Sequence, residues 1–311
     1  MNSTRQNNKG FRPRKLALSL LSVLALHSPL LLAQDDDTQT SESTGYDVSD
    51  WDITNPPFAL TDVNITTDET TWSSLDIAPD GKYFLFDMLG DIYRAGIDGG
   101  KATALTEDFA WNIQPAISPD GSKVAFISDR DGVANVWVMN TDGTELRQVT
   151  KEKNNIIHSP KWSPDGQYIV VTKGIMSSRS IPAGEIWIYH QAGGAGLPIK
   201  ERVNGKRDQQ NIADPVFSHD GKYIYYTQNT VPGARFEYNR DPLEGIFAIT
   251  RFDRSTGEAS RYISGTGGAV VPTPSPDGKY IAFLRRVKYD TALFIKDVET
   301  GVETMLSREL E

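Results

Sequence analysis

Apolar and polar residues alternate in short runs along most of this chain, and turn-forming residues separate the runs. The clearest example lies between Gln114 and Phe126, where one apolar segment enters Ser118-Pro119-Asp120-Gly121 and another leaves it. Serine can hydrogen-bond back to the chain, proline presets its own φ, and glycine tolerates the last position of a tight turn. The pattern therefore predicts two antiparallel strands joined at this turn.

The same unit occurs five times, and its turns share an Asp-Gly pair at one place in each repeat. The pairs are Asp80 and Gly81, Asp120 and Gly121, Asp165 and Gly166, Asp220 and Gly221, and Asp277 and Gly278. The glycines are separated by 40, 45, 55 and 57 residues. Each repeat divides into four short strands, A to D, which in the second repeat are predicted at 114–118, 123–128, 134–139 and 145–150.

A strand-built repeat of about 40 residues is typical of a propeller blade. One isolated meander would leave an apolar face exposed to water, so neighbouring blades must stack on one another. We therefore expect residues 56–311 to form an all-β propeller of four-stranded blades, with five recognisable repeats.

The residues before the repeats predict export. Residues 1–15 are basic, and the apolar stretch that follows, up to Ala33, is short for a membrane span. We interpret residues 1–33 as a signal peptide, with an uncleaved anchor as the alternative, and residues 34–55 as a flexible acidic linker. The expected location is periplasmic or secreted, with no membrane association beyond the export signal.

Charge and cysteine content exclude several classes of partner. The net charge is −9; without the five basic residues of the first 33, 27 basic residues stand against 41 acidic ones, a balance of −14. Such a surface repels nucleic-acid backbones, so no nucleic-acid partner is expected. The chain contains no cysteine, which rules out disulfides and thiolate metal sites.

No catalytic constellation is visible in the sequence. Beyond the signal, the histidines are His158, expected before a strand, His190, expected at a strand end, and His219, expected in a turn. None has metal-ligand spacing, and there is no Gly-x-Ser-x-Gly elbow. Residues 265–268 are glycine-rich but lack the lysine of a phosphate loop, so a link from strand D to the next strand A is expected. We predict no catalytic residue, metal site or cofactor within this chain.

Topology predicts where a binding site would lie. In an up-and-down meander the A–B and C–D turns lie at one end, and the B–C loops and D-to-A links at the other. Both long insertions, residues 173–184 and 228–244, are B–C loops and would rise from the same face. Their basic and aromatic residues are the candidate binding residues: Arg179, Arg235, Phe236, Tyr238 and Arg240. The alternative is that these side chains only cover the loop bases.

The repeats resemble the WD-repeat-like propeller units of the TolB family, with their Ser-Pro-Asp-Gly turn and the second turn at residues 128–132. A narrower resemblance rests on residues 68–76, 86–93, 184–189 and 285–294. These segments look like the N-terminal propeller of large exported bacterial amidohydrolases of the imidazolonepropionase-like type. In that family the metal ligands lie in a hydrolase domain after the propeller, so no catalytic residue carries over to this chain.

The resemblance implies three functions. The first is a binding or scaffold propeller of an amidohydrolase, whose partner is an appended or missing hydrolase domain or a separate protein. The second is a free-standing TolB-like module that binds proteins in the cell envelope. The third, and weaker, is the propeller gate of a prolyl-oligopeptidase-type peptidase.

Ring closure is the last expectation from the sequence. Residues Phe58–Ile65 alternate like a strand that precedes strand A of the first repeat, which is expected near Trp72. Five complete blades and one spare strand suggest that a further A-B-C set once followed Glu311, in a ring of six or more blades. The alternative is a closed five-bladed ring in which Phe58–Ile65 adds to a blade or lies on the surface.

Overall fold

The computed structural model describes residues 52–53, 56, 59–61, 63–175, 183–202, 211–231 and 241–307. Every described residue belongs to one compact unit of the chain. The predicted signal peptide lies outside the described residues. So do all five candidate loop residues: Arg179, Arg235, Phe236, Tyr238 and Arg240.

The described residues form five four-stranded antiparallel sheets, here called blades one to five. Blades one to three consist of β1 (Leu75–Ile77), β2 (Tyr83–Met88), β3 (Asp91–Gly96), β4 (Thr103–Ala104); β5 (Asn112–Ile117), β6 (Lys123–Ser128), β7 (Asn135–Asn140), β8 (Arg147–Gln148); β9 (Ile156–Trp162), β10 (Tyr168–Ile175), β11 (Ala183–His190) and β12 (Leu197–Lys200). Blades four and five consist of β13 (Ile212–Phe217), β14 (Tyr223–Asn229), β15 (Phe247–Asp253), β16 (Ala259–Ile263); β17 (Val270–Pro274), β18 (Tyr280–Val287), β19 (Asp290–Asp297) and β20 (Glu303–Met305).

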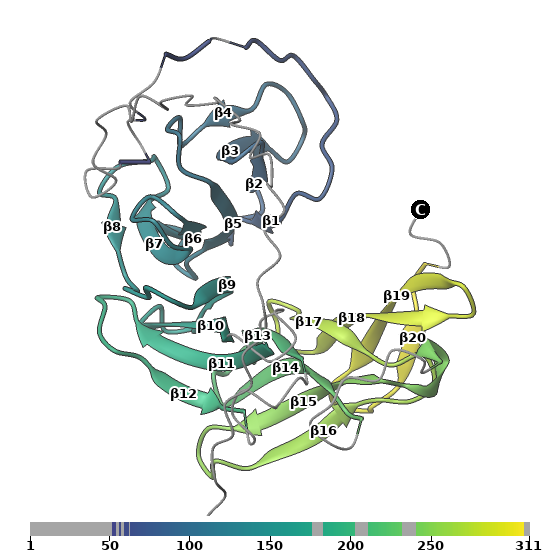
Figure 1. The fold of residues 1–311 in the computed structure, drawn as a ribbon. Coiled ribbons are helices and arrows are strands. Elements are labelled where there is room, and N and C mark those ends of the chain that lie inside the picture. Colours follow the sequence, from purple (N-terminus) through teal and green to yellow (C-terminus); the bar gives the residue numbers. More distant parts are fainter. Residues whose placement is uncertain are drawn as a thin grey trace, which may run out of the picture. The chain divides into compact units, whose positions relative to one another are not determined.

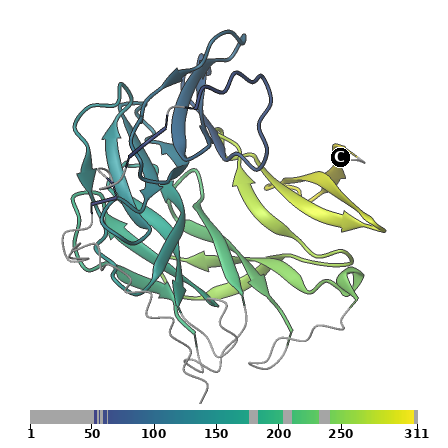
Figure 2. The ribbon, with the colours of Figure 1, turned by 45° about the horizontal axis from the view of Figure 1, so that its top comes forward.

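Within each blade the four strands pair in chain order, and the blades follow one another in a ring (Figures 1 and 2). The one described helical element is the short 3-10 turn η3 (Pro242–Glu244), which precedes β15. The predicted all-β propeller is therefore confirmed. No helix in the described part of the chain is long and apolar enough to cross a membrane.

The turn between strands A and B has the same geometry in every blade. In blade two, the Gly121 N–H donates to the Ser118 carbonyl at 2.8 Å, and Gly121 has φ of 72°. The Ser118 hydroxyl donates to Asp120 Oδ1 at 2.6 Å and accepts from the Lys123 N–H at 2.9 Å. A residue with φ in this region is strained unless it is glycine, which explains the glycine at this place.

The hydrophobic core consists of four clusters, and each lies at a junction between consecutive blades. At the first junction, Leu85 and Ile92 of blade one pack against Val124 and Phe126 of blade two, and all four side chains are fully buried. Both faces of an inner strand must therefore be apolar. This accounts for nearly continuous apolar runs such as Val124–Ile127, which is buried throughout.

Three local expectations are wrong. Residues 59–61 and 63–65, the described part of Phe58–Ile65, form no strand, and Leu60, Val63 and Ile65 are exposed. Alternation alone does not make a strand when no neighbouring edge supplies hydrogen bonds. His158 lies inside β9 rather than before it, and strand A of blade one begins at Leu75, three residues after Trp72.

Candidate functional site

Two features can present a functional surface: the channel along the propeller axis, and the end of the ring that carries the B–C loops and D-to-A links. The candidate loop residues belong to that end by topology, but the structure does not describe them. The structure does describe the strands from which these two loops rise, which are β10 and β11 in blade three and β14 and β15 in blade four.

The channel has a volume of about 600 Å³ and is lined by the innermost strand of every blade. In blades two to five these strands carry a Pro preceded by a residue in the left-handed region. The pairs are Gln114 (φ 56°) and Pro115, Ser159 (55°) and Pro160, Asp214 (54°) and Pro215, and Val271 (55°) and Pro272. The strand pairing shifts register at each of these places, as in a β-bulge.

The bulges join neighbouring blades through backbone N–H groups. The Gln114 N–H donates to Asp87 Oδ2 of blade one at 2.6 Å, and the Ser159 N–H donates to Gln114 Oε1 at 2.7 Å. The Val271 N–H donates to Thr227 Oγ1 of blade four at 3.0 Å. The channel wall is therefore also the connection between blades.

The polar groups of the channel do not form a catalytic arrangement among the described residues. Burial raises the pKa of Asp214, against a hydrogen bond from Thr227. The Ser159 hydroxyl lies 3.2 Å from His158 Nδ1, and burial lowers the pKa of His158. No described carboxylate bonds to the other nitrogen of this ring, so the pair lacks the third group that orients a catalytic base. The described residues also contain no group of three or more His, Asp or Glu side chains that could hold a metal ion.

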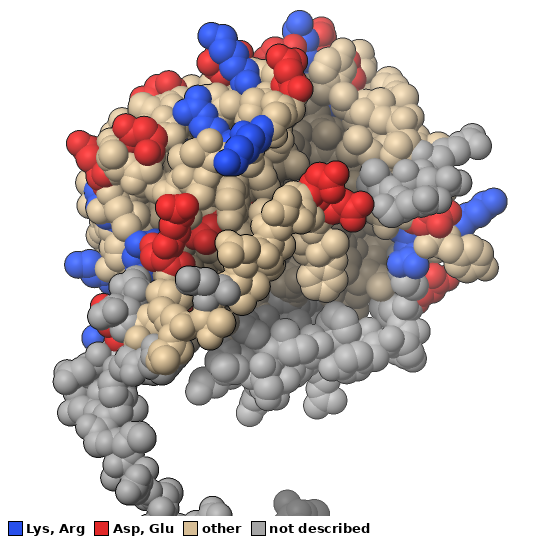
Figure 3. Space-filling view, turned by 90° about the horizontal axis from the view of Figure 1, so that it is seen from above, with Lys and Arg blue, Asp and Glu red and all other residues tan. Residues whose placement is uncertain are grey.

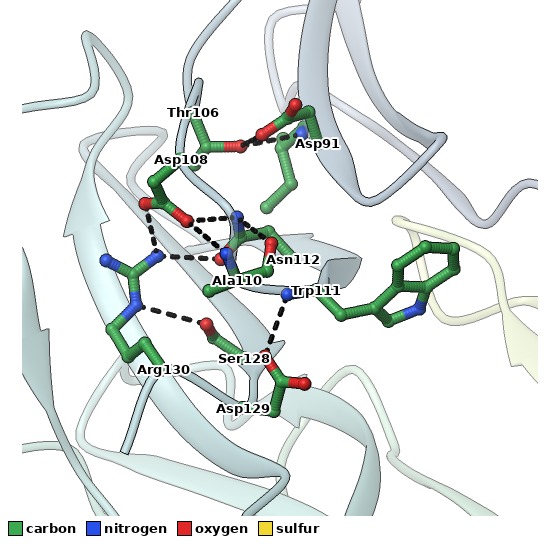
Figure 4. Close-up of polar contacts among 10 residues, drawn as sticks. Asp91, Thr106, Asp108, Ala110, Trp111, Asn112, Ser128, Asp129 and Arg130 are labelled. Carbon is green, nitrogen blue, oxygen red and sulfur yellow. Dashed lines mark hydrogen bonds and ion pairs between the residues drawn. The ribbon is translucent and has the colours of Figure 1, made fainter. Parts of the chain in front are cut away.

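At the loop end, a polar network fixes the first D-to-A link (Figure 4). Arg130, from the B–C loop of blade two, donates from Nη2 to Asn112 Oδ1 at 2.7 Å and pairs with Asp108 Oδ2 at 3.1 Å. Its Nε donates to Ser128 Oγ at 3.0 Å. The Trp111 N–H donates to Asp129 Oδ1 at 2.8 Å. Both neighbours of Trp111 on this link are thus held, while its indole extends away from the network (Figure 4).

The first and second D-to-A links each begin with a threonine that accepts a hydrogen bond from the backbone of strand C. Thr106 of the first link accepts from the Ile92 N–H at 3.0 Å, and Thr150 of the second accepts from the Val136 N–H at 2.9 Å. Two residues after Thr150, Glu152 Oε1 pairs with Lys173 Nζ at 2.8 Å. Burial disfavours the Glu152 charge, but hydrogen bonds from Asn155 and Lys173 outweigh it and lower the pKa of Glu152.

Large apolar side chains remain exposed around this loop end. We call them the rim set; they lie in B–C loops, in the first D-to-A link or in the segment leading into β1: Trp72, Leu89, Phe109, Trp111 and Tyr289. Their exposed fractions run from 55% for Phe109 to 103% for Trp72.

Trp111 and Leu89 are close together because the Trp111 ring packs on Gly90. A Cβ at Gly90 would lie 2.9 Å from the Trp111 ring, and Gly90 has φ of 91°. The Asn112 N–H donates to the Gly90 carbonyl at 2.7 Å. Only glycine fits this place, so the loop supports the exposed indole from below.

On the face seen in Figure 3, the charged side chains favour neither a positively nor a negatively charged partner. Lys and Arg side chains lie between Asp and Glu side chains there, and neither sign forms a continuous patch. The rim set was not predicted from the sequence. The one signal in the sequence was the aromatic pair Phe109 and Trp111 in the first D-to-A link, since the other links carry polar residues. That signal does not show that the two side chains are exposed, because their exposure depends on how the blades pack.

Comparisons with known proteins also indicate a β-propeller. Residues 76–188 match the PD40 family, described as a TolB beta propeller domain. The TolB homolog of Chlorobium luteolum is 34% identical over 186 residues, which covers 58% of this chain and 35% of that protein. Dipeptidyl-peptidase 5 of Porphyromonas endodontalis is 24% identical over 327 residues, which covers 90% of this chain and 45% of the peptidase. The chain spans less than half the length of either relative.

A solved structure assigned as TolB from Agrobacterium tumefaciens shares the fold. Its TM-score is 0.59 at 22% identity, over 76% of this chain and 80% of that one. At this identity the likeness concerns the fold alone. The five blades define a β-propeller, and residues 76–188 of it are similar to the TolB beta propeller domain.

Proposed function

We propose that this chain is an exported, TolB-like module that binds another protein through the rim set. The observation that carries the proposal is the exposure of Trp72, Leu89, Trp111 and Tyr289 at one end of a rigid scaffold. Exposed apolar groups of this size mark interaction surfaces, and tryptophan and tyrosine are frequent anchors of interfaces.

Preorganisation supports the same function. The Arg130 network and Gly90 hold Trp111 in place before any partner arrives. A side chain that is already ordered loses less conformational entropy on binding, so more of its burial contributes to affinity. The basic and aromatic residues of the two long loops, Arg179 and Arg235 among them, would extend this surface.

Site-specific photo-crosslinking tests the proposal. A photoreactive residue replaces Trp111 in one variant and Leu197 in another; Leu197 is 68% exposed beside the opposite, C–D turn end of blade three. The Trp111 position should crosslink to a defined protein in intact cells, and the Leu197 position should not. The purified pair should then bind, and Trp111→Ala should weaken binding at least tenfold while Leu197→Ala changes it less than twofold. Equal crosslinking or equal binding of the two variants would contradict the rim as the site.

The second candidate is the propeller part of a peptidase, and the match to Dipeptidyl-peptidase 5 along 90% of this chain favours it. In that case the loop end would face a catalytic domain. The same crosslinks would then lead to a peptidase, in the same polypeptide or in a separate one.

The amidohydrolase association remains the finer alternative, suggested by the motif at residues 68–76 and its companions. Neither relative described above bears the name of an amidohydrolase. An amidohydrolase reading frame next to this coding sequence, together with crosslinks from Trp111 to its product, would favour this alternative. Export is part of the proposal and rests on the N-terminal sequence; fractionation of cells that express the full chain tests it.

A further inference from the structure

We infer that a pocket between the outer strand of blade three and the face of blade four binds a phosphate group. We call it the junction pocket; the residues that matter in its lining are Lys200, Tyr226, Gln228, Thr250, Ser260 and Arg261. Its volume is about 400 Å³, within the range of about 300–1,000 Å³ that is usual for ligand sites. No residue of the rim set lines it, and the inference does not depend on the proposed function.

Strand pairing brings the polar side chains of the junction pocket together. Thr250 of β15 pairs with Tyr226 of β14 on one side and with Arg261 of β16 on the other. Residues directly opposed in antiparallel strands point to the same face of a sheet. That face of blade four packs on blade three, because Tyr226 belongs to the same core cluster as Ile186 of β11. Lys200 of β12 pairs with Ile186 and therefore reaches the pocket from blade three.

The charged groups in the described lining are both cationic. Lys200 and Arg261 form no ion pair with any described residue. No described Asp or Glu lines the pocket, although Glu201 and Glu258 are close to its lining residues in the sequence. Two unpaired cations without an acid favour an anion, even in a chain whose net charge is −9. A phosphate monoester carries a charge of about −1.5 to −2 near pH 7, which matches both cations.

Tyr226 provides a hydrogen-bond donor at the floor of the junction pocket. Its side chain is fully buried, and its hydroxyl has no hydrogen-bond partner among the described residues. Burial raises the pKa of Tyr226 to about 12, so the hydroxyl keeps its proton at neutral pH. Buried polar groups are almost always hydrogen-bonded in folded proteins, so an unpartnered hydroxyl in the lining of a pocket points to a ligand that accepts from it.

Thr250 orients a second donor. The Thr250 hydroxyl donates to Gln228 Oε1 at 3.0 Å, and no described residue accepts a hydrogen bond from Gln228 Nε2. The amide nitrogen is therefore left to donate to a ligand. Ser260 and Arg261 are exposed and lie at the mouth of the pocket, whereas Thr250 is buried at its floor. Cations and neutral donors thus surround one space, an arrangement that suits the several acceptor oxygens of a phosphate group.

Calorimetric titration of the full chain with inorganic phosphate at low ionic strength tests the site. Phosphate should bind saturably, and acetate should bind at least about tenfold more weakly. Lys200→Ala combined with Arg261→Ala should weaken phosphate binding at least about tenfold. The matched control combines Lys101→Ala with Lys153→Ala, two exposed lysines outside the lining, and should change the affinity less than about twofold. Absent phosphate binding, equal binding of acetate, or equal weakening by the two double variants overturns the inference.

A comparison of two phosphate compounds identifies the source of the group. Glycerol phosphate carries the same group as inorganic phosphate, but as an ester. Tighter binding of the ester would support a phosphate that belongs to a larger molecule, such as a lipid headgroup, whereas equal or weaker binding would support free phosphate.

Tyr226→Phe separates a role in binding from a role in folding. The substitution removes only the hydroxyl, which has no partner to lose, so without phosphate the thermal midpoint should rise or fall by less than about 1 °C. The affinity for phosphate should fall at least about threefold, because the hydrogen bond from the floor is lost. An unchanged affinity, or a midpoint that falls by several degrees in the absence of phosphate, overturns the assignment of this hydroxyl to the ligand and with it the inference.

Discussion

Removal of the Arg130 guanidinium should destabilise the propeller more than the loss of any exposed ion pair. The Arg130 side chain is 9% exposed, and it contacts Asn112 Oδ1, Ser128 Oγ and Asp108. Asn112 and Ser128 are fully buried, so Arg130→Ala leaves buried polar atoms without their donor. Hydrogen bonds to a charged group contribute about 1.5–3 kcal/mol each.

The size of this loss of stability depends on how much of the network stays in contact with solvent. Breaking a buried ion pair costs about 3–5 kcal/mol. Asp108 is 29% exposed and keeps hydrogen bonds from the Ala110 N–H and Asn112 Nδ2, so its carboxylate stays partly solvated and partly bonded. The cost of Arg130→Ala should therefore lie near the lower end of this range, at about 3 kcal/mol. Arg130→Lys should cost less, because it keeps the charge but cannot reproduce the planar fork.

Denaturant unfolding followed by tryptophan fluorescence and circular dichroism measures this cost. The matched control is Lys82→Ala, which removes an ion pair to Asp80 at 3.8 Å from a side chain that is 81% exposed. That pair should contribute about 0–1 kcal/mol. If Arg130→Ala costs no more than Lys82→Ala, the network does not stabilise the first D-to-A link, and the rigid support of Trp111 is refuted as well.

Three further predictions concern the turns and the chemistry. Gly121→Val should lower the thermal midpoint more than Asp120→Ala, because it forces a β-branched residue to a φ of 72° at about 1–3 kcal/mol, against about 1 kcal/mol for lost turn bonds; equal midpoints would contradict the turn geometry. Hydrogen bonds from the Ser118 and Ser163 hydroxyls lower the pKa of the Asp120 and Asp165 carboxyl groups below the ordinary value of 3.8. The stability that the two ionised carboxylates contribute is therefore complete above pH 3.8, and it is lost as pH falls through their lower pKa values in the folded protein. Thermal scans from pH 7 to 2 should show this loss, and Asp120→Asn with Asp165→Asn should flatten it. Protein without residues 1–33 should not hydrolyse amide, cyclic amide or ester substrates, and turnover that survives a chelator and follows the protein through purification would contradict this.

The sequence predicted the inner strands well because two neighbours and two packed faces constrain them. Strand B of blade two was expected at 123–128, and β6 is Lys123–Ser128. The outer strand was expected at 145–150, but β8 is only Arg147–Gln148, since it pairs on one side alone.

The candidate site was harder to predict than the fold. Topology correctly assigned one end to the B–C loops and links, and the five loop residues remain a prediction. The rim set was not predicted because apolar residues such as Leu89 and Trp111 cannot be distinguished from core residues in a sequence. Their exposure arises from the left-handed turn at Leu89 and Gly90 and from how neighbouring blades meet. Neither is encoded by the alternation that identifies strands.

The uniform A–B turns have a consequence for how such a protein can change. Because the serine, aspartate and glycine of the A–B turns in blades two to five bond mainly to one another, one end of each of these blades folds without reference to the opposite end. Loops at the opposite end can therefore vary in length and chemistry with little effect on the register of the strands. New recognition properties can be acquired by exchanging one loop at a time, and grafted loops in blades three and four should be accepted by the same scaffold.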